Sequence, residues 1–539
     1  MTVEQETDRA RLVRSYLEQG FYARRTFAEE LIRGAELFGS VPVTFTGSAA
    51  TVTVGELHRR AVRAAGALQR LGVRPGDVVA VQVPNWVEGV VATEAVLLAG
   101  AVLVPVVHIY GPREVGFILR ESGAKLMIMP DRWRSTDYLA RLPGLLEAPA
   151  LERVIVVGEQ APEPAISWRS LEESADACQP ARQDPDDVCL LIYTSGTTAD
   201  PKGVQHTHET ILSEIRTQPR LIGPGEDEVK LGCFPAGHIA GLLNVMRSLI
   251  LGTPAVLLDA WDAKLAAAMI EEHRVTITSG SPYHLATLLD AAAETGASLA
   301  TLREFMVGAA TVPGELVARA EAAGVVTYRC YGSTEQPTIS SGTIRDPLWP
   351  RQHTDGKAAP GTEIRIVGPD DEDLPAGVDG EVLARGPELF AGYRNPGLDA
   401  VTFAPGGWLR TGDIGRLDEN GYLTITDRSK DVIIRGGETI SSREVEDVLL
   451  AHPAVADTAV VAAPDPRYGD RVCAYVILRP GRTLDLAAVR EHFRAAGIAR
   501  QKTPERLELV GDLPRTALGK VRKAELRARL RAVATEGKA

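Results

Sequence analysis

The stretch from Tyr193 to Val204 reads YTSGTTADPKGV and concentrates hydroxyl groups and glycine in a few positions. Backbone N–H groups and hydroxyls in such a loop can donate hydrogen bonds to anionic oxygens, and Lys202 adds a positive charge. An ordinary surface turn is the alternative, because glycine and proline commonly interrupt regular structure. The stretch is therefore a candidate phosphate-binding loop.

The flanks of this loop favour the phosphate interpretation. VCLLIY, residues 188–193, is a short apolar run that predicts a buried strand. HETILSEI, residues 208–215, begins a helical pattern. We therefore expect the loop to connect a buried strand to a helix, where a helix N-terminus favours an anion.

Four further segments carry side chains suited to a nucleotide or an acid. YGSTEQ spans 331–336, and WLRTGDIG, at 408–415, places an acid in a glycine-bounded turn. DRSKDVIIRGGETISSREVE spans 427–446, and PRTALGKVRK spans 514–523. Together with the loop, and in this order, these segments resemble the adenylate-forming (AMP-binding) superfamily and look closest to the acyl-CoA synthetases. The resemblance runs from about residue 25 to 530.

The resemblance implies an AMP-forming acid–thiol ligase that works in two steps. A carboxylate attacks the α-phosphate of ATP to give an acyl-adenylate and pyrophosphate, and a thiol then displaces AMP. The implied cofactors are ATP, Mg²⁺ and CoA, and the implied substrate is a small-molecule carboxylic acid.

The nucleotide contacts are also implied by the resemblance. The loop holds the β- and γ-phosphates, Tyr331 lies on the adenine face and Thr334 contacts the α-phosphate. Glu335 holds Mg²⁺, which prefers hard oxygen ligands, and Asp413 accepts hydrogen bonds from both ribose hydroxyls. The implied nucleotide-binding and CoA-binding residues are Ser195, Gly196, Thr197, Thr198, Lys202, Gly308, Ala309, Tyr331, Gly332, Thr334, Asp413, Arg428, Gly436 and Gly437.

Lys520 is the cation that we expect to serve the first step. A charge between the carboxylate and the α-phosphate offsets their repulsion, and a unit pair about 4 Å apart is worth roughly 4 kcal/mol at an effective dielectric of about 20. Lys520 follows Gly519 in a loop, whereas the other cations near the C-terminus are expected to be solvated. The implied catalytic residues are Lys520, Thr194, Glu335 and His238.

A rotation of the small domain about a hinge at Lys430 is implied between the two steps. The rotation withdraws Lys520 and brings in the loop of Gly436 and Gly437, where the pantetheine chain can approach the backbone closely. Asp427 and Thr439 stand where many relatives have glycine and asparagine, and we expect both departures to be tolerated.

The acyl pocket is implied to lie between the segments 234–245, 279–284 and 308–311 and the start of YGSTEQPT. These segments are mostly apolar and contain no arginine that would pair with a second carboxylate. We therefore expect an uncharged acid that is aromatic, alicyclic or medium-chain. His238 matches a position that often borders the acyl group and the thiol tunnel, and a structural histidine is the alternative. The pocket residues are His238, Asn244, Ser281, Gly308 and Gln336.

Composition narrows the class of protein further. The net charge of −12 argues against a general nucleic-acid binder. The five cysteines form no CxxC pair, which fits a reducing cytoplasm. The apolar segment 95–107 is too short for a membrane span, and the N-terminus has no apolar signal core.

Two further groups of possible metal ligands do not predict a metal site. His206 and His208 have no third ligand near them in sequence. The acidic cluster 369–373 is expected to be a solvated turn.

The elements that would position these residues form an α/β protein of two domains. Thr53 and Glu56 form a capping box that begins a helix over 53–72, and 76–85 predicts a strand. Helices and strands alternate to about residue 330, which predicts layered parallel sheets. A β-rich subregion follows, and a small α+β domain begins near Lys430. We expect a large N-terminal domain over 1–429 and a small mobile domain over 430–539.

Other functions share the same motifs. A stand-alone adenylation enzyme would load a carrier protein instead of CoA, and another relative would activate nitrite for transfer to an amine. A catalytically silent nucleotide-binding protein is the alternative from another class, and intact Glu335, Asp413 and Lys520 argue against it. A monomer and a homodimer are both compatible with the sequence.

Overall fold

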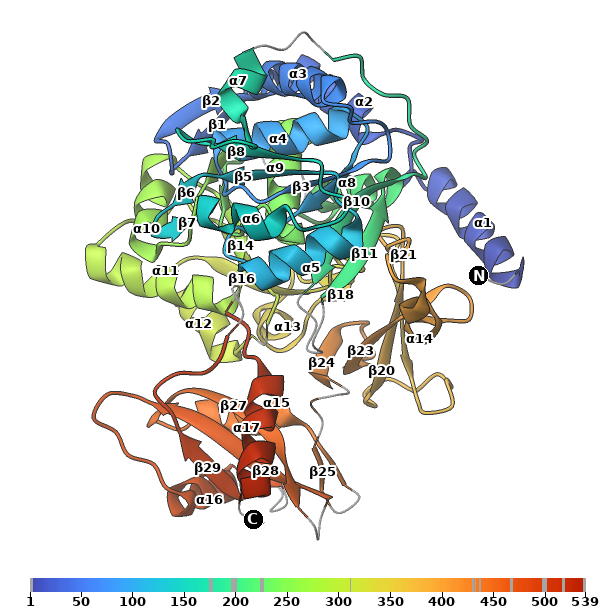
Figure 1. Ribbon diagram of the computed structural model, residues 1–539. Helices are drawn as coiled ribbons and strands as arrows, with labels where there is room; N and C mark the ends of the chain where they lie inside the picture. Colours follow the sequence, from blue (N-terminus) through green and yellow to red (C-terminus); the bar gives the residue numbers. More distant parts are fainter. Residues whose placement is uncertain are drawn as a thin grey trace.

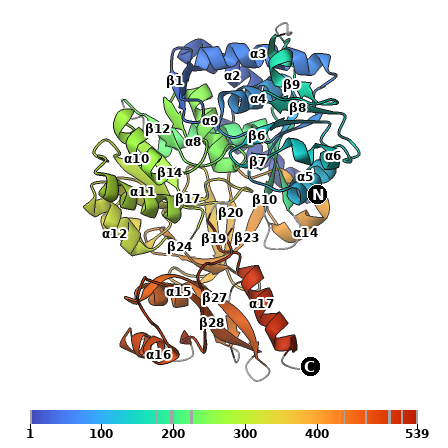
Figure 2. The same cartoon turned by 60° about the vertical axis from the view of Figure 1, so that its left-hand side comes forward.

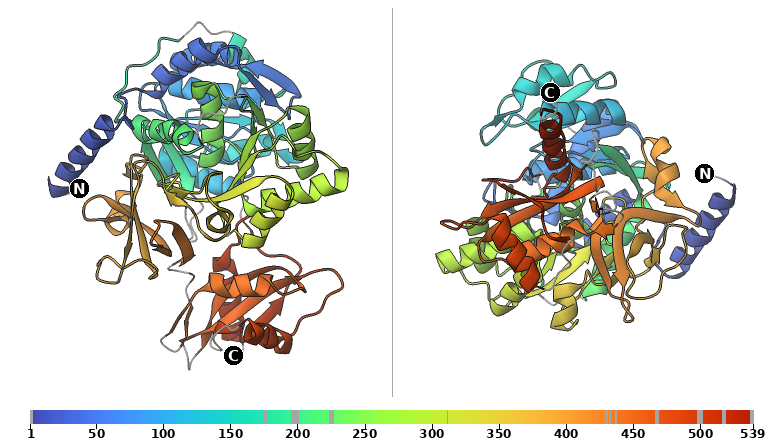
Figure 3. Two further views of the ribbon diagram at one scale, coloured as in Figure 1. Left: turned by 180° about the vertical axis from the view of Figure 1, so that it is seen from behind. Right: turned by 90° about the horizontal axis from the view of Figure 1, so that it is seen from below.

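A computed structural model describes residues 3–173, 178–194, 201–222, 227–310, 312–428, 431, 433–435, 438–465, 469–496, 502–515 and 519–536 of the chain. A large α/β N-terminal domain is followed by a small C-terminal domain at one end of it (Figure 1). The two parts are also separate in the view of Figure 2 and in the left-hand view of Figure 3. Within the described residues, no helix combines the length and apolar character needed to cross a bilayer.

An eight-stranded sheet carries the candidate phosphate loop. Its central strands pair in parallel, whereas β11 pairs antiparallel with β10 on one side and with β21 on the other. In spatial order the strands are β21 (Gly392–Tyr393), β11 (Lys202–Thr207), β10 (Val188–Thr194), β4 (Val102–Pro105), β3 (Val78–Val81), β5 (Leu126–Pro130), β8 (Arg153–Val157) and β9 (Ile166–Ser167).

A nine-stranded sheet carries the YGSTEQ segment at the end of one strand. The neighbouring strands β16, β15, β14, β12, β13 and β1 pair in parallel. Antiparallel strands complete both edges of the sheet. In spatial order they are β18 (Lys357–Ala358), β17 (Ser340–Ser341), β16 (Val326–Tyr331), β15 (Glu304–Val307), β14 (Ile277–Gly280), β12 (Lys230–Gly232), β13 (Ala255–Leu257), β1 (Pro42–Phe45) and β2 (Ala50–Thr53).

Buried helices join the two sheets into one core. Side chains of β1 and β3 share an apolar cluster with α2 (Phe27–Phe38), α3 (Val54–Arg70), α4 (Val87–Leu98) and α9 (Ile239–Leu251). The predicted helix is confirmed as α3, and of the predicted capping box the structure shows the bond in which the Thr53 hydroxyl accepts from the Glu56 N–H. The predicted strand over 76–85 is shorter than expected and covers only Val78–Val81.

Further helices cover the outer faces of the sheets or connect their strands (Figure 1). They are α5 (Pro112–Ser122), α6 (Leu142–Leu145), α7 (Trp168–Glu173), α8 (His208–Ile222), α10 (Ala263–Glu272), α11 (Pro282–Thr295), α12 (Gly314–Ala322), α13 (Leu348–His353) and α14 (Asp399–Thr402). Helix α1 (Val3–Glu18) precedes the first strand and projects from one side of the large domain (Figure 1).

The predicted β-rich subregion is an antiparallel sheet of β19 (Glu363–Val367), β20 (Gly380–Arg385), β22 (Phe403–Ala404), β23 (Trp408–Leu417) and β24 (Leu423–Arg428). The acidic cluster forms a turn closed by the Gly368 N–H, which donates to the Glu372 carbonyl at 3.0 Å. Its acids are not merely solvated, because Arg410 pairs with Asp371 at 2.5 Å and Arg365 with Asp373 at 2.6 Å.

The small C-terminal domain has its own sheet and core. Its sheet packs with two helices around an apolar cluster that includes Ile433, Val460 and Phe493, and a third helix packs through Leu526 and Leu530 in a second cluster. The elements are β25 (Ile433–Arg435), β26 (Glu438–Ile440), α15 (Ser442–Leu450), β27 (Val455–Asp465), β28 (Gly469–Leu478), α16 (Leu486–Ala495), β29 (Arg506–Leu509) and α17 (Lys523–Glu536).

Candidate active site

The candidate phosphate loop joins two antiparallel strands, and the expectation that it leads directly into a helix is wrong. Thr194 at the end of β10 pairs in register with Lys202 at the start of β11. Helix α8 begins only after the whole of β11, at His208. The six residues of β11 therefore separate the loop from the N-terminus of α8. Ser195, Gly196, Thr197 and Thr198 lie outside the described residues.

A segment from the end of the large domain connects this hairpin to the YGSTEQ loop. The Phe390 N–H donates to the Glu335 carbonyl at 2.8 Å, and the next N–H, of Ala391, donates to the Gln205 carbonyl at 2.8 Å. Successive N–H groups of an extended chain point to opposite sides. The segment therefore lies between β11 and the YGSTEQ loop and holds one against the other.

Tyr393 in this segment contacts both a predicted cation and a predicted acid. Its hydroxyl donates to Oε1 of Glu335 at 2.6 Å, and its ring centroid lies 5.1 Å from Nζ of Lys202. Burial and the charge of Glu335 raise the pKa of Tyr393, so the phenol stays protonated and remains a donor. Tyr393 thus couples the phosphate-loop lysine to the acid of YGSTEQ.

His206 fixes the residue that precedes Glu335. Its Nε2 lies 2.7 Å from the Thr334 carbonyl oxygen, and its Nδ1 lies 3.1 Å from the Thr210 hydroxyl. Burial lowers the pKa of His206 to about 4, so the ring is neutral near pH 7. A neutral ring that donates from Nε2 accepts at Nδ1, which matches both contacts. His206 therefore positions Thr334 from β11.

Tyr331 and Asp413, which come from different sheets, meet directly. The Tyr331 hydroxyl donates to Oδ2 of Asp413 at 2.7 Å. Asp413 is 5% exposed, and its own N–H donates to the Thr411 hydroxyl at 3.1 Å. Asp413 also pairs in register with Arg428 across β23 and β24. The structure thus brings the three residues predicted to contact adenosine to one place.

Two glycines allow close approach of backbone in this region. A Cβ at Gly332 would lie 2.0 Å from the Pro337 carbonyl oxygen, and one at Gly308 would lie 2.5 Å from Sγ of Cys330. Ala309, the next residue, has φ of 64°. A non-glycine residue in the left-handed region costs energy and is frequent at functional sites. The tight packing is consistent with the predicted contacts of Gly308, Ala309 and Gly332.

The carboxylate of Glu335 is suited to serve as a ligand of Mg²⁺. A carboxylate is a hard oxygen donor, and the bond from Tyr393 described above is to Oε1 and not to Oε2. Among the described residues, no group of three histidine, cysteine or acidic side chains could enclose a metal. Mg²⁺ typically takes one or two carboxylates together with water and substrate phosphates, so a single carboxylate beside a phosphate loop suits it.

The predicted acyl-pocket histidine caps a helix. Nδ1 of His238 accepts from the Ala240 N–H at 3.2 Å at the start of α9, and burial lowers its pKa to about 4. The His238 ring stacks on Phe234 with centroids 5.6 Å apart, and Phe234 in turn meets the edge of His284. Ser281 lies 2.7 Å from Nδ1 of His284 through its hydroxyl. The segments 234–245 and 279–284 therefore form one wall.

The loop of Lys520 reaches this wall from the small domain. A Cβ at Gly519 would lie 3.6 Å from Cβ of Tyr283, which follows Ser281 at the start of α11. The backbone at Gly519 has φ of 83°, so glycine supplies the turn that presents Lys520. Lys430, Gly436, Gly437 and the side chain of Arg428 lie outside the described residues.

Asp427 links the last strand of the large domain to the first long helix of the small one. Its Oδ2 accepts from the Ser442 N–H at 2.5 Å, and its Oδ1 accepts from the Ser442 hydroxyl at 3.2 Å. Nearby, the Ser441 hydroxyl donates to the Thr426 carbonyl at 2.7 Å. An acid at a helix N-terminus is stabilising, which gives the departure from glycine at this position a structural reason.

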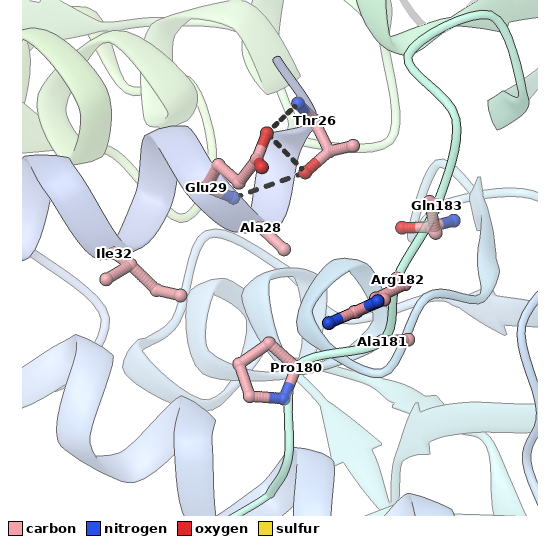
Figure 4. A pocket seen from close by; sticks show the side chains of 8 residues that line it. All are labelled: Thr26, Ala28, Glu29, Ile32, Pro180, Ala181, Arg182 and Gln183. Carbon is pink, nitrogen blue, oxygen red and sulfur yellow. Dashed lines mark hydrogen bonds between the residues drawn. The ribbon is translucent and has the colours of Figure 1, made fainter.

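A pocket of 370 Å³ lies elsewhere, between the start of α2 and the segment 180–183. Figure 4 shows Thr26 and Glu29 joined by hydrogen bonds on one side and Arg182 and Gln183 on the other. These bonds form the capping box of α2. The residues that line the pocket include none of the predicted site residues, so it does not mark the candidate active site.

The chain is similar to known proteins over most of its length. A profile of the AMP-binding enzyme family matches residues 35–394, and a profile of the AMP-binding enzyme C-terminal domain matches residues 444–520. A medium-chain fatty-acid–CoA ligase of Escherichia coli (strain K12) is 34% identical over 523 residues, which cover 95% of this chain and 92% of that protein. A salicyl-AMP ligase / salicyl-S-ArCP synthetase of Mycobacterium tuberculosis is 34% identical over 484 residues, covering 88% and 84%.

A solved structure of similar architecture is the anthranilate CoA ligase in complex with anthranoyl-AMP. It superposes with a TM-score of 0.86 at 26% identity and covers 95% of this chain and 98% of that chain. The likeness therefore includes both the large α/β domain and the small C-terminal domain.

Proposed function

Because the chain belongs to the AMP-binding enzyme family and is an adenylate-forming enzyme, we propose that it is an AMP-forming acid–CoA ligase. The carboxylate of the acid attacks the α-phosphorus of ATP, and the bond to the β-phosphate oxygen breaks to release pyrophosphate. The CoA thiolate then attacks the acyl carbon, the C–O bond between the acyl carbon and the phosphate breaks, and AMP leaves with that oxygen and the electron pair of the bond. The products are a thioester, AMP and pyrophosphate.

The proposal depends most on the contact chain from Lys202 through Tyr393 to Glu335. It places a cation over the ring of Tyr393 and a carboxylate at the hydroxyl of the same residue, next to the end of the phosphate loop. Lys202 would bind the terminal phosphates, and Glu335 would hold Mg²⁺. When bound, Mg²⁺ neutralises phosphate charge and orients the leaving pyrophosphate. Asp413 would bind the ribose hydroxyls next to Tyr331, whose ring would lie on adenine.

Lys520 would serve the first step from the small domain. Its loop contacts Tyr283 beside the proposed acyl wall, where a cation can lie between the carboxylate and the α-phosphate. Stabilisation of charge that develops in the transition state is often a large part of catalysis. Because the Lys520 loop lies beside Tyr283, we propose that the two domains are arranged here as they would be during adenylation.

The second step would need a different arrangement of the domains. We propose a boundary at 429/430 with Lys430 as the hinge, and a rotation that replaces Lys520 by the loop of Gly436 and Gly437. The contacts of Asp427 with Ser442 and of the Thr426 carbonyl with Ser441 would restrict such a rotation. Motions of this kind commonly turn about a few residues at the ends of elements.

Pyrophosphate exchange is the experiment that tests the proposal. The purified chain would be incubated with ATP, labelled pyrophosphate and Mg²⁺ across a panel of carboxylic acids and nitrite, and the active acid would then be offered CoA. We expect acid-dependent exchange, AMP and an acyl-CoA of the predicted mass. Formation of ADP and phosphate would contradict the chemistry.

Loading of a carrier protein is the second candidate, since one of the similar proteins is a salicyl-S-ArCP synthetase. Transfer of the acyl group to a purified carrier protein, without formation of acyl-CoA, would favour it. Transfer of nitrite to an amine would favour the third possibility and would leave the adenylating role of the site intact.

A further inference from the structure

A buried acid holds the far end of the YGSTEQPT loop, residues 331–338. The Thr338 N–H donates to Oε2 of Glu388 at 3.2 Å. Thr338 follows Pro337 and precedes β17, so its N–H lies outside the strands of the sheet. A buried backbone donor outside a strand ladder needs another acceptor. Glu388, whose side chain is fully buried, supplies that acceptor.

Two further contacts join the same part of the chain, residues 388–393, to Glu335. The Phe390 N–H donates to the Glu335 carbonyl at 2.8 Å, and the Tyr393 hydroxyl donates to Oε1 of Glu335 at 2.6 Å. The segment 388–393 therefore contacts the proposed Mg²⁺ ligand at its backbone and at its side chain. Through Glu388 it also contacts Thr338, three residues further along the loop. The orientation of Glu335 thus depends on how this segment lies against the loop.

Glu388 is held in turn by a side chain of α8. It shares a side-chain hydrogen bond with Glu214. Oε1 of Glu214 accepts from Nη2 of Arg247 on α9 at 2.7 Å and from the Thr338 hydroxyl at 3.1 Å. The side chains of Glu214 and Arg247 are only 2% and 8% exposed. Glu214 is therefore fixed by an ion pair, and from that position it can orient Glu388.

One proton accounts for the pairing of the two acids. Burial and the charge of Glu214 raise the pKa of Glu388 well above its ordinary value, so Glu388 is neutral near pH 7. Oε1 of Glu388 and Oε2 of Glu214 have no other hydrogen-bond partner among the described residues. A neutral carboxyl group can donate with one oxygen and accept with the other. Glu388 can therefore donate to Glu214 while it accepts from the Thr338 N–H.

We infer that Glu388 is a positioning residue for Glu335, because it joins the YGSTEQPT loop to α8 and so fixes the segment that orients the proposed Mg²⁺ ligand. The inference rests on the proposed function and adds a residue to its Mg²⁺–ATP site. Helix α8 follows β11 directly in the chain, so the same link connects the hairpin of Lys202 to the loop of Glu335.

Two substitutions of Glu388 separate its hydrogen bonds from its volume. Glu388→Gln keeps a neutral side chain of the same shape, whose amide can donate to Glu214 and accept from Thr338. Glu388→Met fills a similar volume and leaves the buried Thr338 N–H without an acceptor. We expect Glu388→Met to raise the Mg²⁺ concentration for half-maximal ATP binding about tenfold or more, whereas Glu388→Gln should stay within about threefold of the wild-type chain.

Calorimetric titration with ATP over a series of Mg²⁺ concentrations is the readout, and thermal unfolding reports stability. The same titration in EDTA should give similar ATP affinities for Glu388→Met and the wild-type chain, because the Mg²⁺ ligand is then idle. Glu94→Gln and Glu94→Met are the matched controls. Glu94 is 1% exposed, forms a hydrogen bond with His58 and is not one of the predicted site residues. Glu94→Met should lower stability and leave the Mg²⁺ dependence unchanged.

Thr338→Val is the second variant and decides the outcome if Glu388→Met does not fold. It deletes the hydroxyl that donates to Glu214 and keeps the branched shape of the side chain. We expect it to raise the same Mg²⁺ concentration about threefold or more, because a net hydrogen bond is lost on the path from α8 to the loop.

Three results would overturn the inference and leave the proposed function standing. The first is an unchanged Mg²⁺ dependence in folded Glu388→Met, or in Thr338→Val where Glu388→Met does not fold. The second is an equal loss of ATP affinity with and without Mg²⁺, which would make Glu388 a stabiliser of the whole loop. The third is a Glu388→Gln variant as impaired as Glu388→Met. Absence of pyrophosphate exchange and of ATP binding in the folded wild-type chain would instead refute the proposed function, and the inference with it.

Discussion

Tyr393→Phe tests the coupling of the phosphate-loop lysine to Glu335. The change deletes only the hydroxyl, which donates to Oε1 of Glu335 at 2.6 Å, and keeps the ring that faces Lys202 at 5.1 Å. The residue is 5% exposed, and phenylalanine fills the same space. We therefore expect the fold and the position of Lys202 to survive, while the carboxylate of Glu335 loses its fixed orientation.

The size of the expected loss in activity follows from the type of hydrogen bond that Tyr393→Phe removes. A hydrogen bond to a charged group contributes about 1.5–3 kcal/mol, and each ~1.4 kcal/mol changes a rate or an affinity tenfold. We expect kcat/KM for ATP in pyrophosphate exchange to fall by about 10- to 150-fold. The Mg²⁺ concentration that gives half-maximal ATP binding should rise in parallel.

The assay measures ATP binding by calorimetry over a series of Mg²⁺ concentrations, together with exchange kinetics and thermal unfolding. Tyr328→Phe is the matched control. The Tyr328 hydroxyl also donates to a buried glutamate, Glu304, with a bond of 2.8 Å, and Glu304 is not one of the predicted site residues. This control should alter stability but not the Mg²⁺ dependence. An unchanged Mg²⁺ dependence in Tyr393→Phe, or the same rise in Tyr328→Phe, would refute the coupling.

Other predictions concern single residues of the site and the domain contact. Asp413→Asn should reduce kcat/KM for ATP more than tenfold, about 1.4 kcal/mol or more, and normal kinetics in a folded variant would remove Asp413 from ribose binding. Lys520→Ala should lower acyl-adenylate formation by several orders of magnitude, yet a supplied acyl-adenylate should still react with CoA in single-turnover assays; equal loss of both steps would contradict the two arrangements. Asp427→Gly should speed thioester formation relative to adenylation, because it releases Ser442, and an unchanged ratio would show that this contact does not limit the rotation. Stability should fall as pH drops from about 6.5 towards 4: the pKa of His206 is lowered to about 4 in the folded chain, so the unfolded chain takes up its proton first, a loss of about 2 kcal/mol at pH 5 from this histidine alone. His206→Gln should reduce that slope in chemical denaturation, and an unaltered slope would exclude His206 as the source.

Much of the site was predictable from the sequence because it depends on local chemistry. The order and residue types of the motifs at 193–204, 331–336 and 408–415 carry the resemblance that implies phosphate, metal and ribose binding, and the structure places Tyr331 of one motif against Asp413 of another. The helix α3 was predictable for a similar reason, since Thr53 caps it within a few residues. Such signals depend on contacts that are close along the chain.

Other features depend on pairing between distant segments, and only the tertiary structure decided them. Tyr393 meets Lys202 and Glu335 because β21 pairs with β11 in a particular register. The loop is a hairpin rather than a strand–helix turn because β11 finds partners on both sides. Arg247 lies 33 residues from Glu214 in the chain, yet the two are 2.7 Å apart. A pattern of apolar residues predicts which face of a helix is buried. It does not predict which side chains that face will contact, because those contacts depend on how the whole chain packs.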